Sequence, residues 1–394
     1  MKISRLNNIF FYLLCSQLIF ISGYFYHTPL ISDSINTNKA IFMHVIGIIW
    51  FMVGYFTGSF AHALQKKPIK EQVDDRQYSF SNAYYVCSYL LIIAGLIIAI
   101  SQVIYFIPLT EYISELLSGD FEQNIRVIFL LSAEEGGFPG IVKMFGYAPL
   151  SIYLMSLGHL NFTPLSAVDK RRLRILSILA LGAIVIKVFF SLDRLTILAV
   201  LAANIFVGFN KGYIKKIRYW LLIVFIVFLA NYLSTKRLQE GLGIINFTLL
   251  YFKLGLVNFQ FMLDTVSKHT YGFATIFAPA YFIFKFFNFP LPDVFDIQAV
   301  WEWNSAQYFS SYAFQDFGYF YFILFYVVGI FLYQIDNQVK KNIYVNSIFF
   351  IVLYGALSFV VVPAIRGVEF WLALLLPLIL VNQFTKKFEY SIIP

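Results

Sequence analysis

The sequence predicts an all-α fold, a polytopic integral membrane helical bundle with about ten transmembrane helices. Charged residues make up only 13% of its 394 residues, whereas a soluble domain carries about 25%. Apolar residues reach 60% and aromatic residues 20%. Apolar stretches that are long enough to cross a hydrocarbon core of about 30 Å occur repeatedly along the chain. This composition excludes an ordinary soluble globule, whose surface needs far more polar residues.

Ten apolar segments are expected to span the membrane. The first follows Lys2 and Arg5, as in a signal peptide, but no small-residue cleavage site comes after it, so we interpret it as an uncleaved span. The ten segments are Ile9 to Tyr26, Ala40 to Leu64, Ala83 to Tyr105, Gly140 to Leu160, Ile175 to Phe190, Leu195 to Phe209, Tyr219 to Leu233, Phe317 to Ile335, Tyr344 to Val362 and Phe370 to Val381.

Lys and Arg residues are concentrated in alternate loops, which sets the orientation of the spans because cytoplasmic loops are rich in both. The basic loops and ends hold Lys2 and Arg5, Lys66 to Arg76, Lys170 to Arg174, Lys211 to Arg218, Lys340 with Lys341, and Lys386 with Lys387. Both termini are therefore placed in the cytoplasm. Because these loops account for the net charge of +8, nucleic acid is not an expected partner.

A long loop late in the chain, residues 234–316, is expected on the opposite, outer side. Phe247 to Leu263 and Phe273 to Phe289 are apolar and aromatic, but lysines, a glycine and a proline interrupt them. We expect helices that lie at the membrane interface, anchored by aromatic side chains. The alternative is two further spans, twelve in total, with the same orientation elsewhere. Residues 1–394 are interpreted as a single membrane domain.

Arginines at the outer ends of spans are candidates for binding an anion, because a guanidinium fits phosphate oxygens in pairs. Arg194 lies in the shortest outer hairpin, where it either binds a ligand, extends to lipid headgroups or pairs with Asp193. Arg366 and Glu369 are three residues apart in the last outer loop, about one helical turn. Either they pair with each other, or Arg366 binds an anion while Glu369 orients it or acts as a base.

A second basic group opens the long loop. Lys236 and Arg237 lie beside Glu240 just outside a span. They form either a solvated helix end or a second phosphate contact, with Glu240 as a third candidate base. Arg126, in the medium outer loop from Phe106 to Pro139, is a weaker candidate for the same role.

The end of the long loop combines aromatic and polar side chains. Trp301 and Trp303 precede Asn, Gln, Ser and Tyr residues, a composition typical of a sugar-binding surface and equally of an aromatic belt. Asp316 is either the N-terminal cap of the next span, which we favour, or a carboxylate held at the membrane rim and available as a base. His269 and Tyr271, earlier in the loop, are further candidates for sugar contacts.

Several classes of site are missing from the sequence. The five histidines are scattered and the two cysteines, Cys15 and Cys87, lie in apolar segments, so neither a metal site nor a disulfide is predicted. The dispersed glycines give no phosphate-binding or dinucleotide fingerprint, so no cofactor is expected. Carboxylates are nearly absent deep within the spans, which argues against an ion-coupled transporter.

Three local patterns and the topology resemble the Wzy-type O-antigen polymerases, which polymerise oligosaccharide repeat units. The patterns are the hairpin from Ser191 to Arg194, the Asp316–Phe317–Gly318 step that leads into a span, and the Arg366–Gly367 step before the last span. The resemblance implies a glycosyltransferase of a bacterial inner membrane that makes O-antigen or capsular polysaccharide. Its partners would be membrane lipid, undecaprenyl-pyrophosphate-linked oligosaccharide and a chain-length regulator protein.

The resemblance also implies a reaction on the periplasmic face. A sugar hydroxyl of one lipid-linked unit attacks the anomeric carbon of the growing chain, and undecaprenyl pyrophosphate leaves. Arg194, Arg366 and Arg237 with Lys236 would stabilise the leaving group, and Asp316, Glu369 or Glu240 would take the proton of the hydroxyl.

Three other functions remain open. An O-antigen ligase shares the topology and the lipid donor, and a histidine in the large loop, such as His269, would favour it. A glycosyltransferase that uses polyprenyl-phosphate sugars would need an acidic motif in the first outer loop, where Asp33 stands alone. A flippase for lipid-linked oligosaccharide would move the same substrate without chemistry, but its loops should be short.

Overall fold

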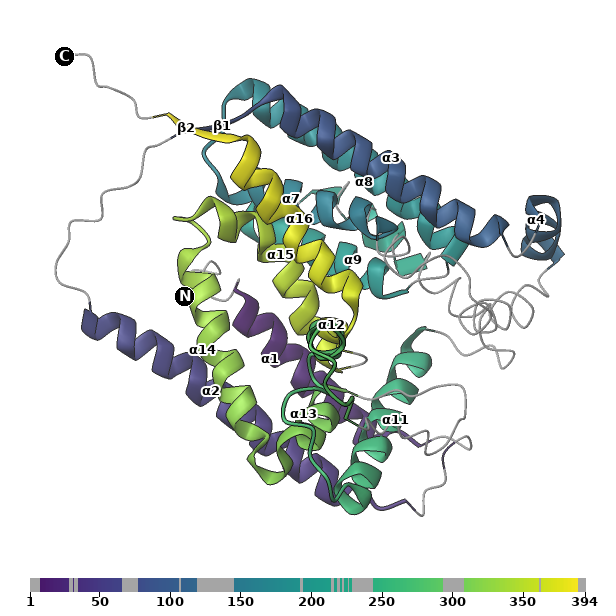
Figure 1. Ribbon diagram of the computed structural model, residues 1–394, viewed down its shortest axis with the longest axis vertical. Helices are drawn as coiled ribbons and strands as arrows, with labels where there is room; N and C mark the ends of the chain where they lie inside the picture. Colours follow the sequence, from purple (N-terminus) through teal and green to yellow (C-terminus); the bar gives the residue numbers. More distant parts are fainter. Residues whose placement is uncertain are drawn as a thin grey trace. The chain divides into compact units, whose positions relative to one another are not determined.

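A computed structural model describes residues 8–27, 31, 35–65, 77–105, 108–118, 145–191, 194–213, 216, 217, 220, 221, 223–225, 227, 228, 244–292, 308–360 and 363–388. The described residues form helices and one two-stranded antiparallel sheet of β1 (Gln77–Phe80) and β2 (Thr385–Phe388), as Figure 1 shows. The predicted all-α character is confirmed, and the short sheet is an addition that the sequence did not predict.

Four helices are long and apolar enough to cross a membrane, or up to five if a bent pair forms one span. The four are α2 (Asn38–Gln65), α3 (Asn82–Ile104), α8 (Ala167–Ser191) and α15 (Ile343–Leu357) with its extension η5 (Ser358–Val360). The bent pair is α13 (Phe309–Phe317) and η4 (Gly318–Phe320), followed by α14 (Phe322–Gln338). These helices mark the chain as a membrane protein.

Most of the other predicted segments are also helical, but their helices are shorter. Near the predicted first span, for example, α1 ends at Phe20 and a 3₁₀ turn follows it. The predicted Tyr219 to Leu233 span lies partly outside the described residues. The shorter helices are α1 (Ile9–Phe20) with η2 (Ile21–Phe25), α4 (Leu109–Ser118), α7 (Ala148–Phe162), α9 (Arg194–Asn210), α11 (Ile244–Thr265), α12 (Phe277–Phe286) and α16 (Val368–Phe384).

The chain forms two compact units that alternate along the sequence. Unit 1 comprises Met1–Val73, Ile245–Val339 and Val352–Trp371, and unit 2 comprises Asp74–Ile244, Lys340–Ile351 and Leu372–Pro394. Neither unit is continuous in sequence. The residues around Asp316 and Arg366 that are described below belong to unit 1, whereas the helices beside the basic loops belong mainly to unit 2.

Helices α2 and α14 form the main contact within unit 1, and glycines bring their backbones together (Figure 1). A Cβ added to Gly54 would collide with the carbonyl of Tyr326, and one added to Gly329 would collide with the carbonyl of Phe51. In a membrane the hydrophobic effect does not drive helices together, because lipid tails are as apolar as the helices. Close backbone packing of this kind stabilises the helix pair instead.

The start of α1 is fixed on the same helix pair. The carboxylate of Asp336 accepts hydrogen bonds from the backbone N–H of Ile9 at 3.0 Å and from the Tyr55 hydroxyl at 3.1 Å. The Asn8 side chain accepts from the Phe11 N–H at 2.9 Å. These acceptors satisfy N–H groups that a helix leaves unpaired in its first turn. A carboxylate of α14 thereby connects α14 to α1 and α2.

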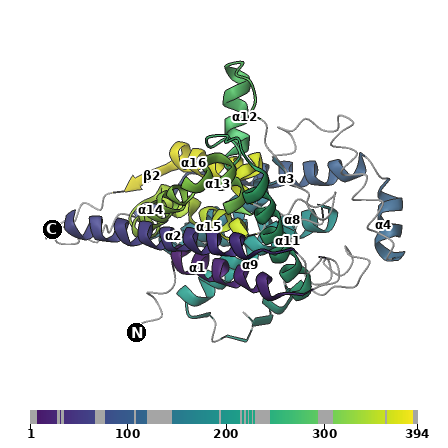
Figure 2. The same ribbon diagram turned by 90° about the horizontal axis from the view of Figure 1, so that it is seen from below.

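The two apolar segments of the long loop fold differently from each other. In α11 the eight residues 252–259 are all buried, so this helix belongs to the interior of unit 1 rather than to its surface. In α12 the side chains of Phe282, Ile283 and Phe286 are 53%, 53% and 81% exposed. Figure 2 shows α12 projecting away from α2 and α14. Of the two segments, only α12 has the exposed aromatic surface expected of an interfacial helix.

Unit 2 packs α8 against α3 and α7 and buries a lysine. The sequence suggests that Lys187, near the end of α8, extends to the membrane surface. Instead Lys187 is only 4% exposed, and its ammonium lies 3.1 Å from the centroid of the Tyr147 ring. A desolvated cation over an aromatic face is strongly attracted by the ring quadrupole.

This contact predicts a selective effect on stability. Tyr147→Leu should lower the free energy of unfolding by about 2 kcal/mol, because the buried ammonium loses the ring face. Tyr147→Phe, which keeps the ring, should stay within about 0.5 kcal/mol of the original protein. Thermal denaturation of the detergent-purified variants checks this expectation. Equal loss in both variants would assign the stabilisation to the hydroxyl instead of the ring.

Segments rich in basic residues meet at one end of unit 2. The β1–β2 register pairs Ser79 with Lys386 and Tyr78 with Lys387, and Tyr78 also forms a bridge with Leu165. The Lys211 ammonium donates to the carbonyl of Asn161 at 3.2 Å. Burial, and then the positive charge of Lys170, lower the pKa of Lys211. The fold thus gathers several of the loops that the charge pattern assigns to one side.

Candidate functional site

A sharp bend between α13 and α14 forms the centre of the candidate site. The chain direction bends by 117° between the two helical segments. The bend begins at Gly318, whose φ of 55° lies in the left-handed region that favours glycine. A Cβ at Gly318 would also come within 2.7 Å of the His269 ring. The bend therefore requires a glycine for two independent reasons.

Asp316, the penultimate residue of α13, is fully buried beside this bend. Its carboxylate accepts hydrogen bonds from the Thr270 hydroxyl at 2.5 Å and from the backbone N–H groups of Ala274 at 2.9 Å and Thr275 at 2.8 Å. The favoured expectation that Asp316 caps the following span is wrong, because α14 begins after Tyr321 and Asp316 binds a different segment. Its carboxylate instead supplies the charge and the acceptors that hold a loop in place.

That loop, residues 266–276, joins α11 to α12 and covers the end of α13. The backbone N–H groups of Thr270 and Tyr271 donate to the carbonyls of Gln315 and Asp316, each at 3.2 Å. Tyr271 has a φ of 50° and Gly272 a φ of 100°, which turn the chain back toward Asp316. Left-handed geometry at Tyr271 is costly for a residue with a Cβ, so the surrounding hydrogen bonds must stabilise it.

Arg366 lies against the same loop from a third segment. It ends the short helix η6 (Ala364–Arg366), and its Nε donates to the carbonyl of Ala274 at 2.8 Å. The guanidinium carbon lies 3.5 Å from the centroid of the Tyr312 ring and 5.5 Å from that of Phe277. A hydrogen bond at Nε and stacking on an aromatic face together fix the plane of the guanidinium.

Glu369 follows Arg366 in the first turn of α16 and is half-buried. A Cβ built on Gly367 would lie 2.5 Å from its Oε2 atom, so the carboxylate folds back beside Gly367. Arg366 and Glu369 therefore flank one glycine that has no room for a side chain. The structure places an arginine, a carboxylate and the loop anchored by Asp316 within the same part of unit 1.

Buried polar side chains on α13 complete this region. Gln315 is fully buried, and within the described part of the chain neither its amide nitrogen nor its amide oxygen has a hydrogen-bond partner. The Nδ1 atom of His269 lies 3.3 Å from the carbonyl of Gln315. Buried amides normally have partners, so Gln315 provides both a donor and an acceptor for a polar group that enters here.

The structure brings together five of the residues proposed from the sequence: Asp316, Glu369, Arg366, His269 and Tyr271 all lie in unit 1. The Tyr271 side chain is 84% exposed. Arg194 begins α9 in unit 2, and its side chain lies outside the described part of the structure. Six further candidates lie outside the described residues: Glu240, Lys236, Arg237, Arg126, Trp301 and Trp303.

Three residues of the site are not among the candidates predicted from the sequence: Thr270, which binds Asp316, Tyr312, which stacks on Arg366, and Gln315. The serine, glutamine and aspartate of α13 within an aromatic stretch were the available signal, but they are equally typical of a membrane-surface belt. Among the described residues, no group of three or more His, Cys, Asp or Glu could hold a metal ion.

Comparisons with known protein families, with curated proteins and with solved structures found no match for this chain.

Proposed function

We propose that this protein polymerises undecaprenyl-pyrophosphate-linked oligosaccharide repeat units, as a glycosyltransferase of O-antigen or capsular polysaccharide biosynthesis. The observation that carries the proposal is the oriented guanidinium of Arg366, with Glu369 beside it and the Asp316-anchored loop behind it. A pyrophosphate leaving group needs fixed positive charge where its own charge develops. A guanidinium plane held by stacking and by one hydrogen bond meets that need.

The two carboxylates have different roles in the proposed reaction. Glu369 is half-buried, with its carboxylate beside Gly367, the residue after Arg366, and in the proposed reaction it takes the proton of the attacking sugar hydroxyl. A bond then forms between that oxygen and the anomeric carbon of the growing chain. The bond from that carbon to the pyrophosphate breaks, and Arg366 stabilises the departing anion. Asp316 is fully buried with three donors and acts by positioning the loop that carries Ala274.

The proposed membrane arrangement keeps ten spans, or twelve, both termini in the cytoplasm, and the 234–316 segment on the periplasmic side. The gathering of basic loop segments at one end of unit 2 supports this orientation, because such loops face the cytoplasm. The aromatic surface of α12 supports an interfacial position for that helix. A polyprenyl chain would reach the site through the lipid beside it, and a chain-length regulator would act on the same assembly.

Deleting the gene in its host and sizing the surface glycolipid on a gel tests this function. Core carrying a single repeat unit is expected, because export and ligation continue while polymerisation stops. Bare core with accumulated lipid-linked polymer would contradict the proposal and indicate a ligase. Bare core without polymer would indicate a flippase, and an unchanged ladder would exclude all three functions. Complementation with the intact gene controls for effects on neighbouring genes.

A further inference from the structure

A cavity of about 510 Å³, lined by polar and apolar side chains, lies in unit 1 between the start of α2 and the end of α11. Its walls include the side chains of Asn36 and Lys39 from the α2 side and of Gln260, Phe261 and Asp264 from α11. This volume lies within the range of small-molecule sites. None of these residues belongs to the site around Arg366.

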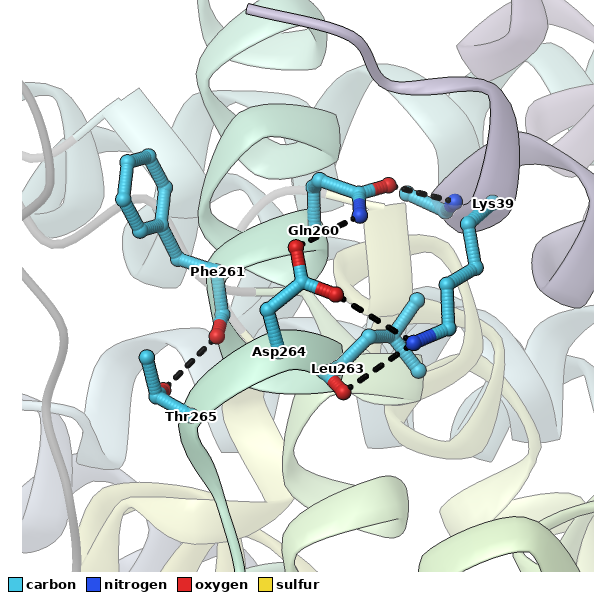
Figure 3. Close-up of polar contacts among 7 residues, drawn as sticks. Lys39, Gln260, Phe261, Leu263, Asp264 and Thr265 are labelled. Atoms are coloured by element: carbon cyan, nitrogen blue, oxygen red, sulfur yellow. Dashed lines mark hydrogen bonds and ion pairs between the residues drawn. The ribbon is translucent and has the colours of Figure 1, made fainter.

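Hydrogen bonds fix the polar walls of the cavity, as Figure 3 shows. The Lys39 ammonium donates to the Asp264 carboxylate and to the Leu263 carbonyl, each at 3.2 Å. The Gln260 amide donates to Asp264 at 2.8 Å and accepts from the backbone N–H of Ala40 at 3.1 Å. Both Asp264 oxygens thus have a donor and are held in one orientation, as in a preorganised binding site.

The ion pair in this arrangement contributes little to stability. Lys39 and Asp264 are 41% and 53% exposed, and exposed ion pairs contribute only about 0.2–1 kcal/mol. The two charges cancel, so the cavity does not select an anion or a cation. The amide and carboxylate groups still line the cavity and can form hydrogen bonds with a ligand.

We infer that this cavity binds a neutral pyranose through its hydroxyl groups. Each hydroxyl both donates and accepts, as do the side-chain amides of Asn36 and Gln260, and adjacent hydroxyls can donate to the two oxygens of one carboxylate. Ile35 and Phe261 also line the space and can contact the C–H groups of a sugar ring, while Figure 3 shows the Phe261 ring directed away from Lys39. A phosphate would meet the Asp264 carboxylate.

The fold links this cavity to the Arg366 site. The loop that Asp316 anchors begins directly after α11, and Thr270 follows Asp264 by six positions. On α2, four positions after Lys39, the carbonyl of Met43 accepts a hydrogen bond from the Tyr321 hydroxyl at the α13–α14 bend. The inference rests on the proposed function only in assigning the pyranose to the sugar part of the same lipid-linked substrate.

Saturation-transfer NMR on the full chain in lipid nanodiscs tests the inference with four probes: the methyl glycosides of glucose, galactose, mannose and N-acetylglucosamine. At least one is expected to bind. Asp264→Asn and Gln260→Leu should weaken that binding at least tenfold. Thr265→Ala, which changes the next residue of α11 without lining the cavity, should bind as the original protein does. Thermal denaturation identifies any variant that fails to fold, and Asp264→Asn, at a half-exposed position, then decides.

Two results would overturn the inference: no transfer to any of the four glycosides, or equal transfer in the Asp264 and Thr265 variants. Displacement of the glycoside by inorganic phosphate would overturn it as well, since the cavity would then be an anion site. Glycoside binding that depends on Asp264 supports the cavity even where gene deletion leaves the polymer ladder unchanged, a result that would contradict the proposed function but not the cavity.

Discussion

Replacing Arg366 by alanine should abolish the polymer while the amount of protein in the membrane stays the same. The side chain is half-buried beside Tyr312 and Ala274, and it supplies the charge that the leaving pyrophosphate requires in the proposed reaction. Loss of one such donor in an active site typically lowers the rate by about 10² to 10³. The gel ladder of the complemented deletion strain, with an immunoblot of the membrane fraction, measures both quantities.

Two matched variants sharpen this test. Arg366→Lys should also fail, because an ammonium provides neither the planar fork nor the same stacking on Tyr312. Lys285→Ala removes another cation of unit 1, one on α12 whose ammonium lies 5.4 Å from the Tyr281 ring, and should leave the ladder intact. Arg194→Ala is expected to remove the polymer as Arg366→Ala does. A normal ladder in either arginine variant would exclude that arginine from the proposed reaction.

Asp316→Ala should strongly destabilise the protein, by about 3 kcal/mol or more. It leaves one hydroxyl and two backbone N–H groups without their buried acceptor, and each unsatisfied group costs about 1–3 kcal/mol. Asp316→Asn should lower the free energy of unfolding less than Asp316→Ala does, because one side-chain oxygen remains as an acceptor. Some loss is still expected, because the new NH₂ group faces an N–H donor. Thermal denaturation of the purified variants measures the loss.

Thr270→Val is the control for this role, since it removes one donor to Asp316 and changes no charge. It should destabilise the protein by about 1 kcal/mol and lower polymer in proportion to the lost protein. The opposite pattern would identify Asp316 as the base instead of the anchor. In that case Asp316→Asn would be as thermostable as the original protein and would produce no polymer. Adding Thr270→Val to this variant would change neither result.

The long helices could be predicted from the sequence because apolar stretches determine them locally. The predicted span from Ala40 to Leu64 lies within α2, and the one from Ile175 to Phe190 lies within α8. The bend at Gly318 was not predicted, because a glycine within an apolar stretch is compatible with a straight helix in a membrane. Its conformation depends on His269, which comes from a distant segment.

The residue types of the site were more predictable than their roles. Arg366 and Glu369 are three residues apart, but the predicted helical turn between them is wrong, because Arg366 ends η6, Gly367 is extended and Glu369 lies in the first turn of α16. Asp316 binds partners 41 to 46 residues earlier in the chain, and no periodicity reports such a contact. Without those partners, a carboxylate near the start of a predicted span resembles a helix cap. Tyr312 and Arg366 are also far apart in the sequence, so their stacking could not be predicted from it.

The alternation of the two units along the chain also constrains how the protein is made. The helix partners α2 and α14 are separated by most of unit 2, and Arg366 follows both of them. A ribosome therefore releases α1 and α2 into the bilayer long before α14 exists to cover the glycines of α2. The nascent chain must remain unassembled through many rounds of insertion, and premature termination anywhere before α14 would yield a fragment without its partner helix. Membrane proteases and insertases would encounter this protein chiefly during that interval.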